Sequence, residues 1–133
     1  MEVYKSKYML LEYWEEYNLI ELTWLPETEN KTEEEYKEEL LNYLECCIIY
    51  KPTGLISDTR EYFFTVSIEL QEWTNTTVFT RLLELGLSRV AFVRSPELIA
   101  QLSIEQTLEE NEGSKFTTQY FDNKESAKEW IIS

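Results

Sequence analysis

The sequence predicts an α/β domain in which strands alternate with helices. Two observations predict it: β-rich runs recur along the chain, and runs with a helical repeat of apolar residues separate most of them. The expected order is β-β-α-β-α-β-α-β-α, which implies parallel pairing, right-handed crossovers and helices that cover a sheet. A chain of 133 residues suits one domain, and no repeat or low-complexity tract divides it, so the domain is expected to span 1–133.

Two strands are expected near the N-terminus, at residues 8–14 and 19–25. Residues 17–18 between them can turn a hairpin. In the second strand every second residue from Ile20 is apolar, a period of two that indicates one face more buried than the other. Pro26 ends this strand.

The stretch "KTEEEYKEELLNYLECCIIY", residues 31–50, is the clearest helix. Thr32 followed by Glu35 forms a capping box, and acidic residues fill the first turn, where the helix dipole favours them. One apolar stripe repeats at helical spacing: Tyr36, Leu40, Tyr43, Leu44 and Cys47. The charged residues opposite are expected to form a solvated face.

An apolar strand, Gly54–Ser57, follows this helix, and the next helical run covers residues 65–86. The segment "TNTT" at 74–77 predicts a break or kink that divides the run into two pieces. Gly86 is placed to cap its C-terminal end.

The run Val90–Val93 lacks strict alternation, as expected for a strand that is covered on both faces. Ser95 and Pro96 then suit the N-cap and first position of another helix. The last strand is expected within 115–121.

The final helix is expected to begin at a second capping box, formed by Asp122 with Glu125. Ala127, Trp130 and Ile131 follow at helical spacing. These three apolar side chains are expected to pack inward.

Charge and cysteine content limit the partners and the compartment. The net charge is −14 without a histidine, and such a surface repels phosphate backbones and anionic membranes, so no nucleic acid is expected. No apolar run approaches the roughly 20 residues that span a bilayer, and no signal peptide is visible. The adjacent Cys46 and Cys47 cannot join distant parts of the chain, which fits a reducing, cytoplasmic location.

Three stretches carry a resemblance to a known family: "GLISDTREYFFTVSIELQEW", "GLSRVAFVRS" and the ending "FDNKESAKEWI". Together with the element order they resemble the SpoIIAA-like, or STAS (sulfate transporter and anti-sigma factor antagonist), domains over nearly the whole chain. The resemblance implies a small mixed sheet with helices packed mainly on one face. It also implies self-association, here as a homodimer, and regulatory binding of a protein partner rather than catalysis.

In the anti-anti-sigma branch of that family, a partner kinase phosphorylates a serine or threonine near the start of the helix after the third strand. Thr65 and Ser67 occupy the corresponding region here, although the acidic residue that precedes the family's phosphoacceptor is missing. A phosphate at a helix N-terminus is electrostatically favourable. The alternative is that Thr65 simply caps the helix.

A second candidate region lies where the predicted strands end. Asp58, Arg60, Arg94 and Ser95 are expected near the carboxyl ends of neighbouring parallel strands, where open α/β sheets usually place ligands. One carboxylate and two guanidinium groups there can bind a small anion or a partner. The alternative is that Asp58 caps a turn and Arg94 neutralises the acidic surface.

Catalytic motifs are absent from the sequence, which has no histidine as a general base, no glycine-rich phosphate loop and no Cys/His metal cluster. No cofactor, metal or catalytic residue is therefore expected. Cys47 is expected in the core, and the four tryptophans suit either a hydrophobic pocket or core positions.

Three functions remain open. The first is a STAS-like interaction module that recognises a protein. The second is a carrier or sensor of a small apolar or lipid-like ligand, as in Sec14-type domains, which requires a cavity between sheet and helices. The third and least supported is an enzyme.

Overall fold

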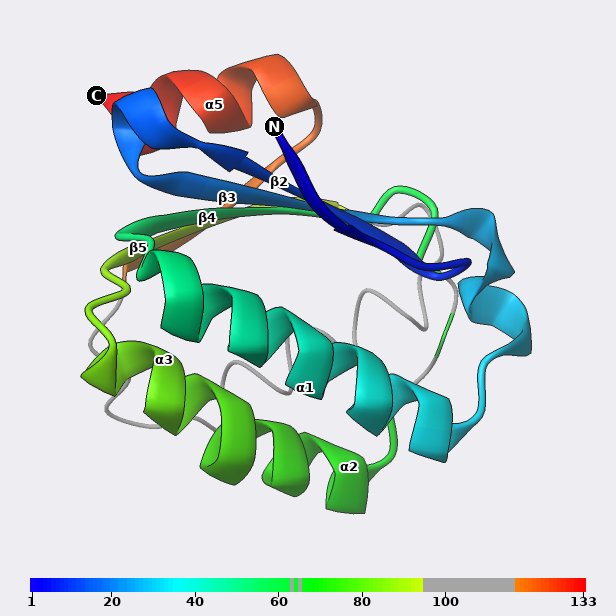
Figure 1. Cartoon of the computed structure of the whole chain (residues 1–133). Coiled ribbons are helices and arrows are strands. Elements are labelled where there is room, and N and C mark those ends of the chain that lie inside the picture. The colour runs from blue at the N-terminus through cyan, green and yellow to red at the C-terminus, as the bar shows by residue number, and fades with distance from the viewer. Residues whose placement is uncertain (63, 65, 95–116) are drawn as a thin grey trace.

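The computed structural model describes residues 1–62, 64, 66–94 and 117–133. These residues form one six-stranded sheet in which strand order follows chain order (Figure 1). The strands are β1 (Glu2–Lys5), β2 (Met9–Trp14), β3 (Leu19–Trp24), β4 (Gly54–Asp58), β5 (Arg89–Val93) and β6 (Thr117–Phe121). Strands β1, β2 and β3 pair antiparallel, whereas β3 through β6 pair parallel. The expected α/β fold with a partly parallel sheet is confirmed.

The first strand, β1, was not predicted. It is only four residues long, it pairs with β2 across an irregular register between Glu2 and Tyr4, and none of its residues is buried. A short edge strand without a buried face lacks the apolar alternation from which strands are recognised.

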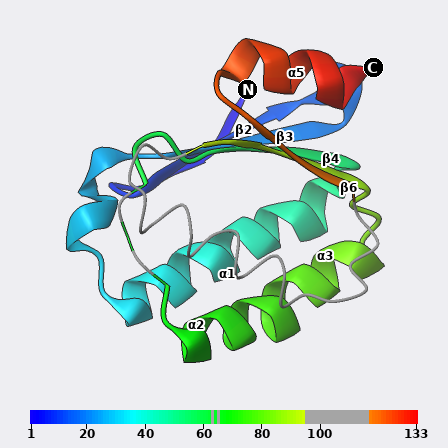
Figure 2. The ribbon, with the colours of Figure 1, turned by 180° about the vertical axis from the view of Figure 1, so that it is seen from behind.

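The described helices cover both faces of the sheet. The helix α1 (Glu33–Tyr50) lies on one face together with a second helical rod, made of α2 (Ile68–Trp73), the π-helical segment η3 (Thr74–Phe79) and α3 (Thr80–Glu84). The last helix, α5 (Lys124–Ile132), lies on the opposite face (Figure 1, Figure 2). Two short 3-10 turns, η1 (Glu15–Tyr17) and η2 (Pro26–Asn30), flank β3.

The expected break or kink at 74–77 takes the form of a π-helical segment, which separates α2 from α3 while the chain stays helical. The threonine hydroxyls donate hydrogen bonds back to carbonyls: Thr74 to Leu70, at 2.8 Å, and Thr76 to Glu72, at 2.9 Å. These local bonds widen the helix rather than ending it.

Each face of the sheet has its own apolar core. The larger core lies between the sheet and the α1 face, and the smaller one lies under α5. The smaller core consists of five buried side chains, namely Leu19, Ile56, Ala91, Val93 and Ala127. Successive side chains of a strand point to opposite faces, so adjacent residues of β4 serve different cores.

Two helix ends follow the predictions, and the start of α5 is shifted by one residue. Thr32 and Glu35 form the expected capping box, and Gly86 closes α3 with a φ of 104°, in the left-handed region that favours glycine. The cap of α5 is Asn123 rather than Asp122, because the Asn123 side chain accepts a hydrogen bond from the Ser126 amide at 2.8 Å.

Candidate functional site

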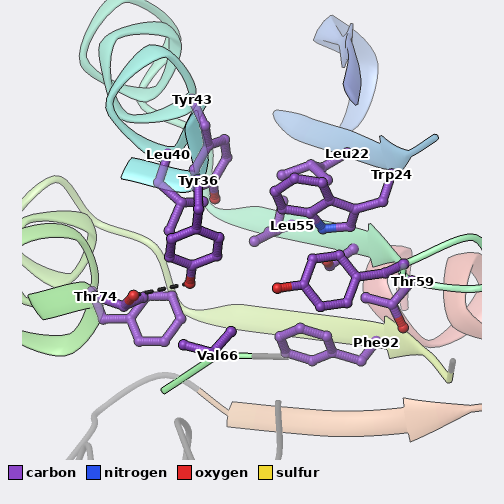
Figure 3. Close-up of a pocket in the computed structure, with 13 residues that line it drawn as sticks. Leu22, Trp24, Tyr36, Leu40, Tyr43, Leu55, Thr59, Val66, Thr74 and Phe92 are labelled. Atoms are coloured by element: carbon purple, nitrogen blue, oxygen red, sulfur yellow. Dashed lines mark hydrogen bonds between the residues drawn. The ribbon is translucent and has the colours of Figure 1, made fainter. Parts of the chain in front are cut away.

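A cavity of about 80 Å³ lies between the sheet and the helices of the α1 face (Figure 3). The pocket is partly open, and most of its wall is apolar. Its lining consists of Leu22, Trp24, Tyr36, Leu40, Tyr43, Leu55, Ser57, Thr59, Tyr62, Val66, Thr74, Phe79 and Phe92. A carrier or sensor of an apolar ligand requires a cavity between sheet and helices, and the structure contains one.

Strand alternation and helix periodicity deliver these side chains to the cavity. Leu55 and Ser57 of β4 point toward it, while Ile56 between them packs under α5. Tyr36 and Tyr43, seven residues apart on α1, face the sheet across the cavity (Figure 3).

Tyrosine hydroxyls are the main polar groups at the cavity wall. The Tyr36 hydroxyl is hydrogen-bonded to Thr74 Oγ1 at 2.9 Å (Figure 3). The buried Tyr43 hydroxyl has no nitrogen or oxygen partner within residues 1–62, 64, 66–94 and 117–133. Burial raises the pKa of Tyr36 and of Tyr43 above the ordinary value, so both stay neutral and act as hydrogen-bonding groups.

Lys31 lies behind this wall inside an aromatic cage, which no pattern in the sequence predicted. Its Nζ is 4.0 Å from the centroid of the Trp24 ring. Four further rings, those of Tyr8, Tyr36, Tyr62 and Phe64, have centroids 5.6, 5.2, 5.4 and 5.3 Å away. The residue is 5% exposed, and burial lowers the pKa of its ammonium to about 7, against the opposing charges of Glu39 and Glu35.

The cage could not be recognised in the sequence because its rings are scattered over 57 positions of the chain, from Tyr8 to Phe64. Only β2, β3, α1 and the segment after β4, once folded together, bring them around one amine. The sole local feature is a lysine just before the capping box of α1.

The structure places Asp58 on the other face of the sheet, away from the cavity. Its carboxylate accepts hydrogen bonds from Arg60 Nη2 at 2.7 Å and Nε at 3.0 Å, and pairs with Lys124 Nζ at 3.2 Å. Lys124 also binds Glu21 at 3.0 Å. Burial raises the pKa of Asp58, but hydrogen bonds from Arg60 and the charge of Lys124 outweigh it and leave the pKa lowered.

These contacts fit the structural alternative for the strand-end residues. Asp58 and Arg60 come together as expected, but they hold a turn and, through Lys124, the first turn of α5. Arg94 pairs with the exposed Asp122 at 3.2 Å. Ser95 lies outside the described residues.

Of the two phosphoacceptor candidates, Ser67 is described and Thr65 is not. Ser67 caps α2, because its Oγ accepts a hydrogen bond from the Leu70 amide at 3.2 Å and donates one to Glu33 at 3.1 Å. The capping role that the sequence assigned to Thr65 therefore falls on Ser67. A phosphate there would meet the carboxylate of Glu33.

The remaining candidates belong to the core. Cys47 is fully buried, and burial raises its thiol pKa to about 12, so the thiolate is disfavoured. Trp24 lines the cavity, while Trp130 packs against the smaller core.

The described ranges hold no group of three or more His, Cys, Asp or Glu side chains placed to bind a metal ion.

In comparisons with known proteins, no family model, no curated protein and no solved structure matches this chain. Across the described residues, every helix is too short or too polar to traverse a lipid bilayer.

Proposed function

We propose that this chain is a non-catalytic binding module that takes up a small apolar molecule between its sheet and α1. The observation that carries the proposal is the aromatic-rich cavity of about 80 Å³. Ligand pockets are typically apolar, with a few placed polar groups, and this one combines ten aromatic and aliphatic side chains with hydroxyls such as that of Thr74.

The energetic cost of the cavity supports a binding role. Protein interiors are close-packed, and an enclosed void destabilises the fold by roughly 24 cal/mol per Å³, which gives an upper bound of about 2 kcal/mol for this partly open pocket. A ligand that fills the space recovers part of that cost as binding free energy.

The volume favours a small ligand over a lipid. An apolar cavity of about 150 Å³ binds benzene, whereas the space here is about 80 Å³. One ring or a short branched chain, partly emerging through the open side, is the size that fits. A Sec14-like cargo with a long acyl chain is not favoured by this volume.

The regulatory role that the STAS resemblance implies can be part of the same proposal. Thr74 and Phe79, at the two ends of the π-helical segment η3, both line the cavity. Such π-helical segments are frequent at functional sites. A ligand that contacts η3 would change the outer surface of this helical rod, and this change would alter the binding of a protein partner or of a second copy of the chain.

Toluene is a suitable probe for the cavity. We expect toluene to raise the thermal unfolding midpoint. At a concentration ten times its Kd, it should increase the free energy of unfolding by about 1.4 kcal/mol. We also expect it to shift the amide NMR signals of residues that line the cavity. Leu55→Phe should fill the cavity and abolish both effects, whereas Ile56→Val, altered on the opposite face of the same strand, should bind toluene normally.

The proposal fails if toluene at its solubility limit changes neither the unfolding midpoint nor the spectra of the unaltered chain. It also fails if Leu55→Phe, shown to be folded, binds toluene as well as Ile56→Val does.

A further inference from the structure

We propose that the ligand of this cavity carries a carboxylate next to its apolar body, and that the carboxylate pairs with Lys31. This inference rests on the proposed function and defines the chemical class of the ligand. The evidence is the position of the Lys31 amine, its lack of a hydrogen-bond acceptor among the described residues, and the rings that it shares with the cavity.

The amine of Lys31 is buried, and none of the described residues pairs with it. Its Nζ has no hydrogen-bond partner in the part of the chain that the structure describes, and the residue is 5% exposed. An ammonium group carries three N–H donors. Aromatic faces stabilise the positive charge by about 2 kcal/mol when it is desolvated, but they leave those donors without a strong acceptor.

Lys31 does not line the cavity itself but lies directly behind rings that do. Three of the rings around its Nζ also line the cavity: Trp24 at 4.0 Å, Tyr36 at 5.2 Å and Tyr62 at 5.4 Å. A small anionic group attached to a ligand in the cavity can reach the amine between these side chains, while the apolar body stays among the aliphatic residues.

The nearby carboxylates of the protein are engaged elsewhere. Glu35 accepts a hydrogen bond from the Tyr8 hydroxyl at 2.6 Å and another from the Thr32 amide at 3.0 Å. Glu39 accepts hydrogen bonds from the Tyr4 hydroxyl at 3.2 and 3.3 Å. Both side chains act on Lys31 through their charge, and neither makes a hydrogen bond to its amine. The acceptor site on Lys31 therefore remains available to a ligand.

The burial of Lys31 adds a pH dependence to this pairing. With a pKa of about 7, the amine is charged below neutral pH and increasingly neutral above it. The charged groups that face it are Glu35 and Glu39 of α1, and the tyrosines of the cage stay neutral in this range. A bound carboxylate stabilises the ammonium form, so affinity should be greatest below pH 7 and fall about tenfold for each pH unit above it.

The test compares benzoate with toluene, two probes that share a ring and differ in the carboxylate. At pH 6 we expect the unaltered chain to bind benzoate at least tenfold more tightly than toluene, as measured by NMR titration. Between pH 7.5 and 8.5 the benzoate affinity should fall about tenfold, whereas the toluene affinity should stay constant.

The matched variant is Lys31→Met, since methionine has a similar length and packs well against aromatic rings. It should keep toluene binding, lose the preference for benzoate and lose the pH dependence. A second measurement does not depend on this variant: the ¹⁵Nζ titration of Lys31 should move to higher pH when benzoate is present.

The outcomes separate the two proposals. If toluene binds but benzoate shows neither a preference nor an effect on the Lys31 titration, the carboxylate inference is wrong and the apolar cavity stands. If neither probe binds, the proposed function fails as well.

Discussion

The two faces of the sheet differ in the pairing of their buried charges and in the packing of their cores. Under α5, Asp58 and Glu21 are buried but paired, with Arg60 or Lys124 within 3.2 Å, and the small core around Ile56 is made of fully buried side chains. On the α1 face, Lys31 is buried beside a cavity, and no described residue supplies a hydrogen-bond acceptor to its amine. Natural proteins depart from complete packing and pairing mainly where they function, and the comparison therefore supports the binding site proposed above on the α1 face.

The largest expected effect comes from truncating adjacent residues of β4. Ile56→Ala should lower the free energy of unfolding by about 4 kcal/mol, because Ile56 is fully buried in the closed core. Leu55→Ala should lower it by about 2 kcal/mol, because Leu55 already borders empty space and loses fewer contacts. Urea denaturation followed by tryptophan fluorescence measures both. Equal losses would show that the two faces are packed alike.

The second effect concerns Lys31 and pH. The pKa of this lysine is lowered from 10.5 to about 7 in the folded chain, so the unfolded chain binds more protons between these values. Stability should therefore rise with pH, by about 3 kcal/mol between pH 7 and pH 9.5, through this group alone. The gain is the difference between the urea-denaturation curves of the unaltered chain and Lys31→Met, which shares every other titrating group. Parallel curves for the two chains would contradict the burial of a free amine.

The smallest effect concerns the paired carboxylate. Asp58→Asn should cost about 2 kcal/mol at pH 7, less than a fully buried ion pair, because Arg60 is half exposed. The matched control Asp122→Asn breaks an exposed pair with Arg94 and should cost less than about 0.5 kcal/mol.

Acid should remove the loss of stability that Asp58→Asn causes relative to the unaltered chain. The pKa of Asp58 is lowered in the folded chain, so its stabilisation is present above the unfolded value near 3.9 and is lost as the pH falls through the folded pKa. Urea denaturation of Asp58→Asn and the unaltered chain at pH 7 and below pH 3 measures this convergence. A cost that persists unchanged in acid would show that the charge of Asp58 is not what stabilises the turn.

The fold was predictable where a few neighbouring residues decide the structure. The capping box at Thr32 and Glu35, the closing glycine Gly86 and the apolar strand Gly54–Ser57 each follow from local steric and hydrogen-bonding preferences. The π-helical segment at 74–79 was not predictable in this way, because threonines that favour a break in isolation are held in the helix by packing against α1.

The site was predictable only in outline. The sequence placed Asp58 at the end of a central strand, which is correct, but the side of the sheet to which it points depends on pairing with β3 and β5. A one-residue change of register would turn the Asp58 side chain toward the α1 face and the Ser57 side chain toward α5. The cage around Lys31 depends on contacts between residues far apart in the chain, which no local pattern encodes.

The strand order described above has a consequence for how the chain folds. Because β1 to β6 follow one another in the sheet, each new strand can add to an edge that is already formed, which keeps most strand contacts close in sequence. Helix α5 is the exception, since it covers β3, β4 and β5 only after all six strands are in place. During synthesis on the ribosome, Leu19, Ile56 and Ala91 would therefore stay exposed to solvent until residues 124–132 emerge.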